Sequence, residues 1–191
     1  ITDTTTSTTY LLGAGSISAP NGISIGTFSV SPATQNLTVP LAITGDVRAT
    51  GINSGANYTG LAATGNVSFS GNLVTSNGGS LAVTAMGNTS VGGYVSTVNA
   101  AGHSGSVLLT GSSVQVLGST SALNAGASID SSNPNGTGNA GQISVVGFAG
   151  GTNIGTWTSP TTVVGGNVYS YASGLVGEER NSAGNVFLFA Y

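Results

Sequence analysis

The pattern that most constrains this chain is a glycine followed by strictly alternating side chains. It is clearest in the last eight residues, Gly184-Asn185-Val186-Phe187-Leu188-Phe189-Ala190-Tyr191. The segment Gly166-Asn167-Val168-Tyr169-Ser170-Tyr171-Ala172 matches it position for position. A period of two places every second side chain on the same face of a β-strand. The chain is therefore predicted to consist of short β-strands that begin at glycines.

The first half of this pattern also occurs three times upstream, in Gly79–Val83, Gly105–Leu109 and Gly141–Val145. The intervals between successive glycines are 26, 36, 25 and 18 residues. Repetition at roughly 20 to 50 residues is typical of proteins that stack one structural unit on the next. All intervals except the longest suit one turn of a β-solenoid. The longest contains the turn-rich segment Asp130–Gly138, which is expected to bulge from one corner.

Composition favours an ordered protein without helices. The chain has 32 glycines, and a glycine inside a helix costs about 1 kcal/mol relative to alanine. Hydrophobic residues make up 39% of the chain and only 4% of residues are charged. Disordered chains instead combine low hydrophobicity with high net charge. We therefore expect an all-β, single-domain fold.

Charge excludes several classes of partner. The net charge is −3, and Arg48 and Arg180 are the only fixed cations in the sequence. Two arginines cannot neutralise a phosphate backbone, so nucleic acid is not an expected partner. No apolar run approaches the roughly 20 residues of a transmembrane helix, so membrane insertion is not expected. The chain begins at Ile1 and has no cysteine. We expect an extracellular protein whose export signal has been removed.

The residues that could carry chemistry are few and scattered. A catalytic site needs titratable groups placed close together. Glu178 and Glu179 are adjacent, and on a strand neighbouring side chains point to opposite faces, so we expect a solvated turn there. His103 has no second histidine or cysteine as a metal-binding companion. We expect no enzyme activity, no cofactor and no metal. The titratable residues considered are Asp3, Asp46, His103, Asp130, Glu178 and Glu179.

The N-terminal part differs from the repeats. Residues 1–12 are rich in threonine and are expected to form an extended arm, because they have strand propensity but little to bury. Residues 13–191 are expected to form the β-solenoid domain, with its register best defined from residue 65 onward. Before that point, alternation predicts short strands at Ile23/Ile25, Phe28/Val30, Leu37/Val39, Leu41/Ile43 and Val47/Ala49.

The repeated segments resemble the repeats of filamentous-haemagglutinin-type exoproteins of two-partner secretion. The resemblance rests on Ala101–Gly111, Gly138–Val145 and Ala183–Leu188, and on the corner Ser18-Ala19-Pro20-Asn21-Gly22-Ile23. It covers about two thirds of the chain. The resemblance implies a right-handed parallel β-helix. A pilin-like antiparallel β-sandwich with strand exchange is the alternative fold.

Aromatic residues gather in the two matched segments. If Val168 and Leu188 face inward, Tyr169 should lie beside Phe187, and Tyr171 beside Phe189, on the outside. An exposed apolar patch of this kind usually marks a partner surface. Two alternatives remain open: the inward and outward assignments are reversed, or a loop such as Thr152–Pro160, which carries Trp157, covers the rings.

We therefore predict an extracellular structural subunit that polymerises head-to-tail into filaments of a bacterial biofilm matrix, sheath or surface fibre. Its main partner would be itself, with extracellular polysaccharide or a cell surface as a further partner. The alternative is a monomeric adhesin or binding module, or a fragment of a larger filamentous-haemagglutinin-like exoprotein. The residues predicted at the subunit interface are Ile1, Thr4, Thr6, Thr8, Tyr169, Tyr171, Phe187, Phe189 and Tyr191.

Overall fold

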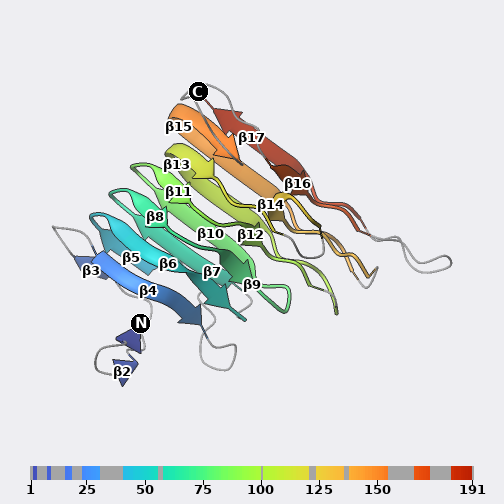
Figure 1. Ribbon diagram of the computed structural model, residues 1–191, viewed down its shortest axis with the longest axis horizontal. Coiled ribbons are helices and arrows are strands. Elements are labelled where there is room, and N and C mark those ends of the chain that lie inside the picture. Colours follow the sequence, from blue (N-terminus) through green and yellow to red (C-terminus); the bar gives the residue numbers. More distant parts are fainter. Residues whose placement is uncertain are drawn as a thin grey trace.

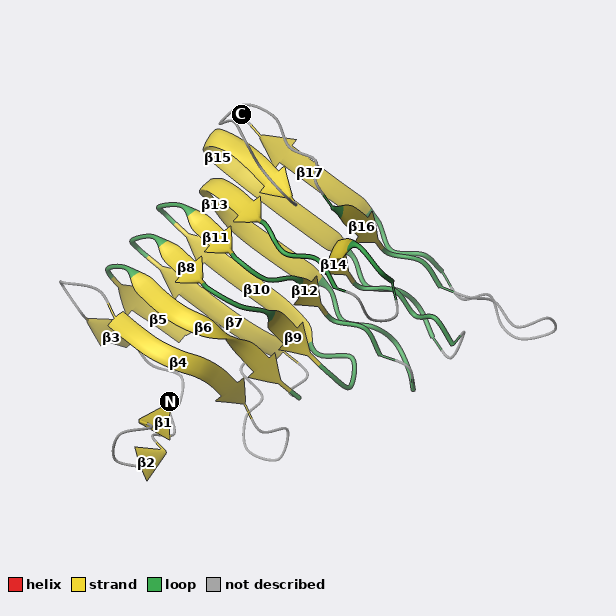
Figure 2. Cartoon of the chain, in the orientation of Figure 1, coloured by secondary structure: helices red, strands yellow, loops and turns green. Residues whose placement is uncertain are grey.

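The protein is all-β throughout the part of the chain that the computed structural model describes. The described residues are 2–3, 8–9, 16–18, 23–30, 41–55, 58–99, 101–120, 124–135, 138–154, 166–172 and 182–190. These residues contain strands and loops but no helix (Figure 2). The strands are β1 (Thr2–Asp3), β2 (Thr8–Thr9), β3 (Ser16–Ser18), β4 (Ile23–Val30), β5 (Leu41–Thr44), β6 (Val47–Ser54), β7 (Tyr58–Ala63), β8 (Val67–Phe69), β9 (Leu73–Thr75), β10 (Ser80–Ala85), β11 (Thr89–Val91), β12 (Val95–Ser96), β13 (Val107–Val116), β14 (Ala127–Asp130), β15 (Ile143–Ile154), β16 (Asn167–Tyr169) and β17 (Val186–Ala190).

The chain passes in turn through three columns of parallel strands (Figure 1). The first column contains β3, β5, β7, β10, the first half of β13, the first half of β15, and β17. The second contains the first half of β4, the first half of β6, β8, β11, and the second halves of β13 and β15. The third contains the ends of β4 and β6, then β9, β12, β14 and β16. We call one pass through the three columns a rung.

This arrangement is consistent with a β-solenoid. Every strand pair of the large sheet is parallel, and parallel neighbours need a crossover connection rather than a tight hairpin. The antiparallel sandwich that the sequence left as an alternative is therefore wrong for this sheet. The register also begins earlier than residue 65, because Ile23 and Ile25 pair with Val47 and Ala49.

Side chains in equivalent positions of successive rungs form the core. In the first column Leu61, Val83, Leu109 and Val145 lie in register, and each is at most 3% exposed. Full burial of such a side chain is worth about 1.5 to 3 kcal/mol. Other columns contribute Val47, Val67, Ile52, Leu73, Val95 and Ile129 in the same way. Repetition of apolar residues at matched positions therefore holds the rungs together.

The glycines that start the first-column strands stack directly on one another. A Cβ on Gly105 would overlap the carbonyl of Gly79, one on Gly141 the carbonyl of Gly105, and one on Gly184 the carbonyl of Gly141. Four of the five glycines in the predicted repeat thus occupy one column. Gly166 does not, because its Cβ would meet Ser128 of the third column. The intervals of 25 and 18 residues around Gly166 are therefore not rungs.

Polar side chains join the rungs at the corner between the first and second columns. The carboxylate of Asp46 accepts a hydrogen bond from the backbone N–H of Asn66 (2.7 Å), and the amide oxygen of Asn66 accepts one from the N–H of Asn88 (2.9 Å). Asn88 in turn accepts a hydrogen bond from the hydroxyl of Ser113 (2.8 Å). The first two bonds satisfy backbone N–H groups at the turns, and the third links a strand residue to the turn of the preceding rung.

From β9 onward, the connections from the third column back to the first lengthen toward the C-terminal rungs. Such connections run from Thr75 to Ser80, then from Ser96 to Val107, then from Asp130 to Ile143. Figure 2 shows these loops extending together on one side of the sheet. The strands stay in register while the extra residues gather on that side.

The N-terminal segment was expected to be an extended arm, and that expectation is not confirmed. Thr2 pairs with Thr9 and Asp3 with Thr8, so β1 and β2 form a separate antiparallel pair. Strand β1 lies close to β4 (Figure 1). The predicted strand at Leu37/Val39 lies outside the described residues.

Candidate assembly surface

The C-terminal rung ends in a strand that has one neighbour. Among the described residues, β17 pairs with β15 alone, so no described strand pairs with its outer edge. In the register of the two strands, Val186 lies beside Ile143, and Leu188 lies beside Val145. Ile143 and Val145 are fully buried, whereas Val186 and Leu188 are 43% and 47% exposed. Val186 and Leu188 thus occupy core positions that no described rung covers.

The aromatic side chains of β17 alternate with these core positions. Phe187 and Phe189 are 38% and 49% exposed. Their rings are stacked, with centroids 6.1 Å apart and planes inclined by 12°. Phe187 continues the outward position of Leu108 and Ser144, and Leu108 is itself 38% exposed. Apolar side chains therefore lie on the outside of the first column at Leu108 and at its open end, with the polar Ser144 between them.

The predicted pairing of Tyr169 with Phe187 and of Tyr171 with Phe189 is wrong. Strand β16 pairs with β14 in the third column, whereas β17 belongs to the first. The two segments match in sequence because a glycine followed by alternation marks the start of a strand in either column. Val168 does pack against the core, as predicted.

Tyr169 and Tyr171 are half-buried and contact each other edge to face, with centroids 6.3 Å apart. The hydroxyl of Tyr171 donates a hydrogen bond to the amide oxygen of Asn124 (3.0 Å). A satisfied hydroxyl and partial burial indicate that Tyr171 helps to hold the rung together. Four other predicted interface residues, Ile1, Thr4, Thr6 and Tyr191, lie outside the described residues, as does Trp157; Thr8 lies in β2.

The segment expected to bulge as a turn-rich insertion is instead partly buried. Residues 130 to 133 are between 0 and 3% exposed. The backbone N–H of Ser131 donates to the carbonyl of Tyr169 (3.0 Å), and the N–H of Asn133 donates to that of Tyr171 (2.8 Å). The next rung therefore covers this segment and pairs with it.

A network of neutral donors surrounds the carboxylate of Asp130. One carboxylate oxygen accepts from the amide of Asn124 (2.6 Å), and the other accepts from the N–H (2.9 Å) and the hydroxyl (2.5 Å) of Ser132. The Ser104 hydroxyl donates to the carbonyl of Ser132 (2.7 Å). Sequence reasoning missed this network. Its one sequence signal is a run of short polar residues, which is the same signal that a turn produces.

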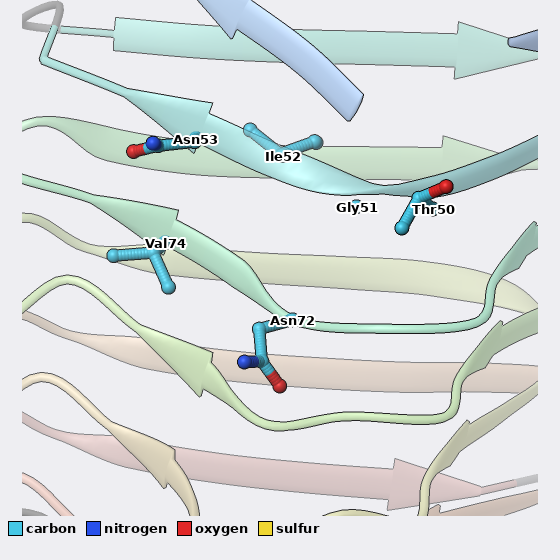
Figure 3. A pocket seen from close by; sticks show the side chains of 6 residues that line it. All are labelled: Thr50, Gly51, Ile52, Asn53, Asn72 and Val74. Carbon is cyan, nitrogen blue, oxygen red and sulfur yellow. The ribbon is translucent and has the colours of Figure 1, made fainter. Parts of the chain in front are cut away.

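A shallow groove of about 330 Å³ lies where the second column turns into the third (Figure 3). Asn53 and Val74 lie one above the other on β6 and β9, in register. The lining contains amides and a hydroxyl but no titratable group. Its lining residues are Thr50, Gly51, Ile52, Asn53, Asn72 and Val74.

The titratable residues of the described segments are not brought together into a catalytic site. Arg48 and Asp46 form an ion pair at 3.6 Å on the surface. His103 accepts a hydrogen bond at Nδ1 from the N–H of Asn139 in the next rung (2.9 Å). No cluster of three or more metal-ligating side chains occurs among the described residues. Glu178, Glu179 and Arg180 lie outside them.

The described residues include no long apolar helix of the kind that spans a bilayer. Searches against protein-family models, curated proteins and solved structures found no match to the chain.

Proposed function

We propose that this chain is an extracellular structural subunit, a right-handed parallel β-helix that polymerises head-to-tail into filaments of a biofilm matrix, sheath or surface fibre. The observation that carries the proposal is the open face of β17. No described strand pairs with its outer edge, and its core-position side chains Val186 and Leu188 are nearly half exposed. A further parallel rung would bury both features at once.

The opposite end of the stack offers a matching edge. Among the described residues, β3 pairs only with β5, and β4 pairs only with β6. A second copy whose β3 met β17 would continue the first column with parallel pairing, and its β4 would lie over the second and third columns. Such a contact uses two different surfaces and does not close on itself, so it propagates as a fibre.

The energetics suit repeated addition. Main-chain hydrogen bonds give affinity that tolerates different side chains, and the exposed apolar side chains add about 25 cal/mol for each Å² removed from water. Phe187 and Phe189 add rings at the rim of the contact. Whether Ile1, Thr4, Thr6 and Thr8 also reach a second copy stays a prediction.

The test is electron microscopy and gel filtration of the purified chain over a range of concentrations, beside the double variant Phe187→Ser/Phe189→Ser. We expect the wild-type chain to form uniform filaments and the double variant to form fewer or shorter ones with unchanged β circular dichroism. A wild-type chain that stays monomeric at every concentration would refute the proposal. Filaments of full length from the double variant would place the contact elsewhere.

A second function, an adhesin that binds neutral polysaccharide, is favoured by the groove beside Asn53 and Asn72. Its amides and the hydroxyl of Thr50 suit the hydroxyl groups of an uncharged sugar, and no charge lines the groove. Glycan binding that is lost in an Asn53→Ala/Asn72→Ala variant would support it. An unchanged binding profile for that variant would remove this second function.

A further inference from the structure

The N-terminal edge of the sheet lies beside a separate strand pair. Strand β4 is paired along one edge by β6, and no described strand of the large sheet pairs with its other edge. Among the residues that the structure describes, strands β1 and β2 pair only with each other, and β1 lies close to β4. Figure 1 shows this pair beyond β4, at the end of the stack opposite β17.

The position of this pair conflicts with the arrival of another rung. Neighbouring strands lie about 4.8 Å apart in the hydrogen-bonding direction. A second copy adding its last rung to β4 would need the layer of space directly beyond that strand. The β1 and β2 pair stands at this end of the stack, so the pair and the arriving copy compete for one place.

The sequence of the β1 and β2 pair has features that disfavour the addition of further strands. Asp3, in β1, is the only charged residue in the first 45 positions of the chain. A charge at an edge strand is one of the devices by which proteins prevent unwanted strand addition. A pair of two-residue strands is also weak, because an isolated two-stranded ribbon is at best marginally stable in water. Such a pair can be displaced.

We propose that β1 and β2 form a removable cap that inhibits self-assembly until it leaves the β4 edge. The occupant that replaces the cap is the C-terminal rung of a second copy of this chain. This inference rests on the proposed function and adds its regulation. Opening or removal of residues 1–9 converts a slow-assembling chain into a fast-assembling one.

The size of the effect follows from the fraction of open chains. When only a fraction of the molecules is competent to bind, apparent affinity falls by that fraction. A cap that is closed in about four chains of five would reduce assembly about fivefold. Opening the cap should therefore raise assembly about fivefold.

The experiment compares full-length variants at equal concentration by light scattering and electron microscopy. Thr8→Pro removes a backbone N–H from β2 and restricts its backbone, whereas Thr8→Ser serves as the matched control. A chain that lacks residues 1–9 provides a second way to remove the cap. Thermal melts followed by circular dichroism establish that each variant is folded.

We expect Thr8→Pro and the truncated chain to assemble at least about fivefold faster than the wild type, and Thr8→Ser to assemble at the wild-type rate. A synthetic peptide of residues 1–12 should slow the truncated chain. Equal rates for all four proteins would refute the cap. Loss of assembly on truncation would also refute it and would indicate that the segment donates a strand. If either of these results came with filaments of the wild-type chain, the cap would be refuted but the proposed filament function would not. If the wild type and all variants stayed monomeric, the cap and the filament function would both be refuted.

Discussion

Thr97 and Gly105 are joined by two hydrogen bonds that close the base of the loop between β12 and β13. The hydroxyl of Thr97 donates to the carbonyl of Gly105 (2.5 Å), and the N–H of Gly105 donates to the carbonyl of Thr97 (3.2 Å). Ser131 and Gly141 repeat both bonds in the next rung, at 2.7 Å and 2.9 Å. These paired bonds bring the chain back to the first column after loops of different length.

Replacing Thr97 by valine should destabilise the protein by about 1 to 3 kcal/mol, because a buried carbonyl loses its donor while side-chain shape is kept. Thr97 is fully buried, so water cannot substitute. Thr97→Ser retains the hydroxyl and should cost less. Urea unfolding of the two variants measures the difference. Equal stability of Thr97→Val and the wild type would mean that the bond contributes nothing net.

Replacing Gly141 by alanine should destabilise the protein by more than about 3 kcal/mol, since the new Cβ would overlap backbone of the preceding rung and overpacking is costly. Gly102→Ala is the matched control, because its nearest atom is the side-chain nitrogen of Asn99 at 3.3 Å. Thermal unfolding by circular dichroism compares them. A Gly141→Ala protein as stable as Gly102→Ala would contradict the glycine column.

The strand positions could be predicted from sequence because alternation depends on local geometry alone. Gly79, Gly105, Gly141 and Gly184 were placed in one repeat, and they do stack. The same signal misplaced Gly166, which starts a strand of the third column. A glycine before an alternating segment records where a strand begins. Which column that strand joins depends on the length of the loops before it. Those loops are fixed by pairing between strands that lie far apart in the sequence.

The buried network at Asp130 could not be predicted for a related reason. Short polar residues satisfy backbone groups both in exposed turns and in buried layers. Burial of Ser131 and Asn133 depends on the segment at Tyr169 and Tyr171, nearly 40 residues later, which pairs with them. On the candidate surface, the register of Phe187 with Ser144 and the exposed Leu108 agrees with the expected outward position. Their predicted neighbours were wrong because β16 and β17 lie in different columns.

Replacing Asp130 by alanine should cost about 2 to 4 kcal/mol, because the Asn124 amide and both donors of Ser132 would lose their acceptor in a buried site. Asp46→Ala is the control, since that carboxylate is one-third exposed and water can replace it. Chemical denaturation of the two variants gives the comparison. A smaller loss for Asp130→Ala than for Asp46→Ala would contradict the network.

Trypsin should not cut the native chain after Arg48. Although its side chain is 64% exposed, Arg48 lies in β6 between β4 and β8, paired on both sides. A protease needs an extended, unpaired segment, so cleavage should follow the population of the opened state. Mass spectrometry of timed digests with and without urea tests this. Cleavage at Arg48 that is equally fast in both conditions would show that this rung is open in the native protein.

The most direct test of end-to-end stacking is negative-stain electron microscopy of Leu188→Asp beside Leu117→Asp. Both residues are at least 36% exposed, so neither substitution should unfold the monomer, and circular dichroism melts check this. Leu188 occupies the open core position of β17, where burial of an unpaired carboxylate is costly, whereas Leu117 lies on the side of the stack. The account predicts filaments for the wild type and for Leu117→Asp, and folded monomers for Leu188→Asp. Filaments of wild-type length from folded Leu188→Asp would contradict it.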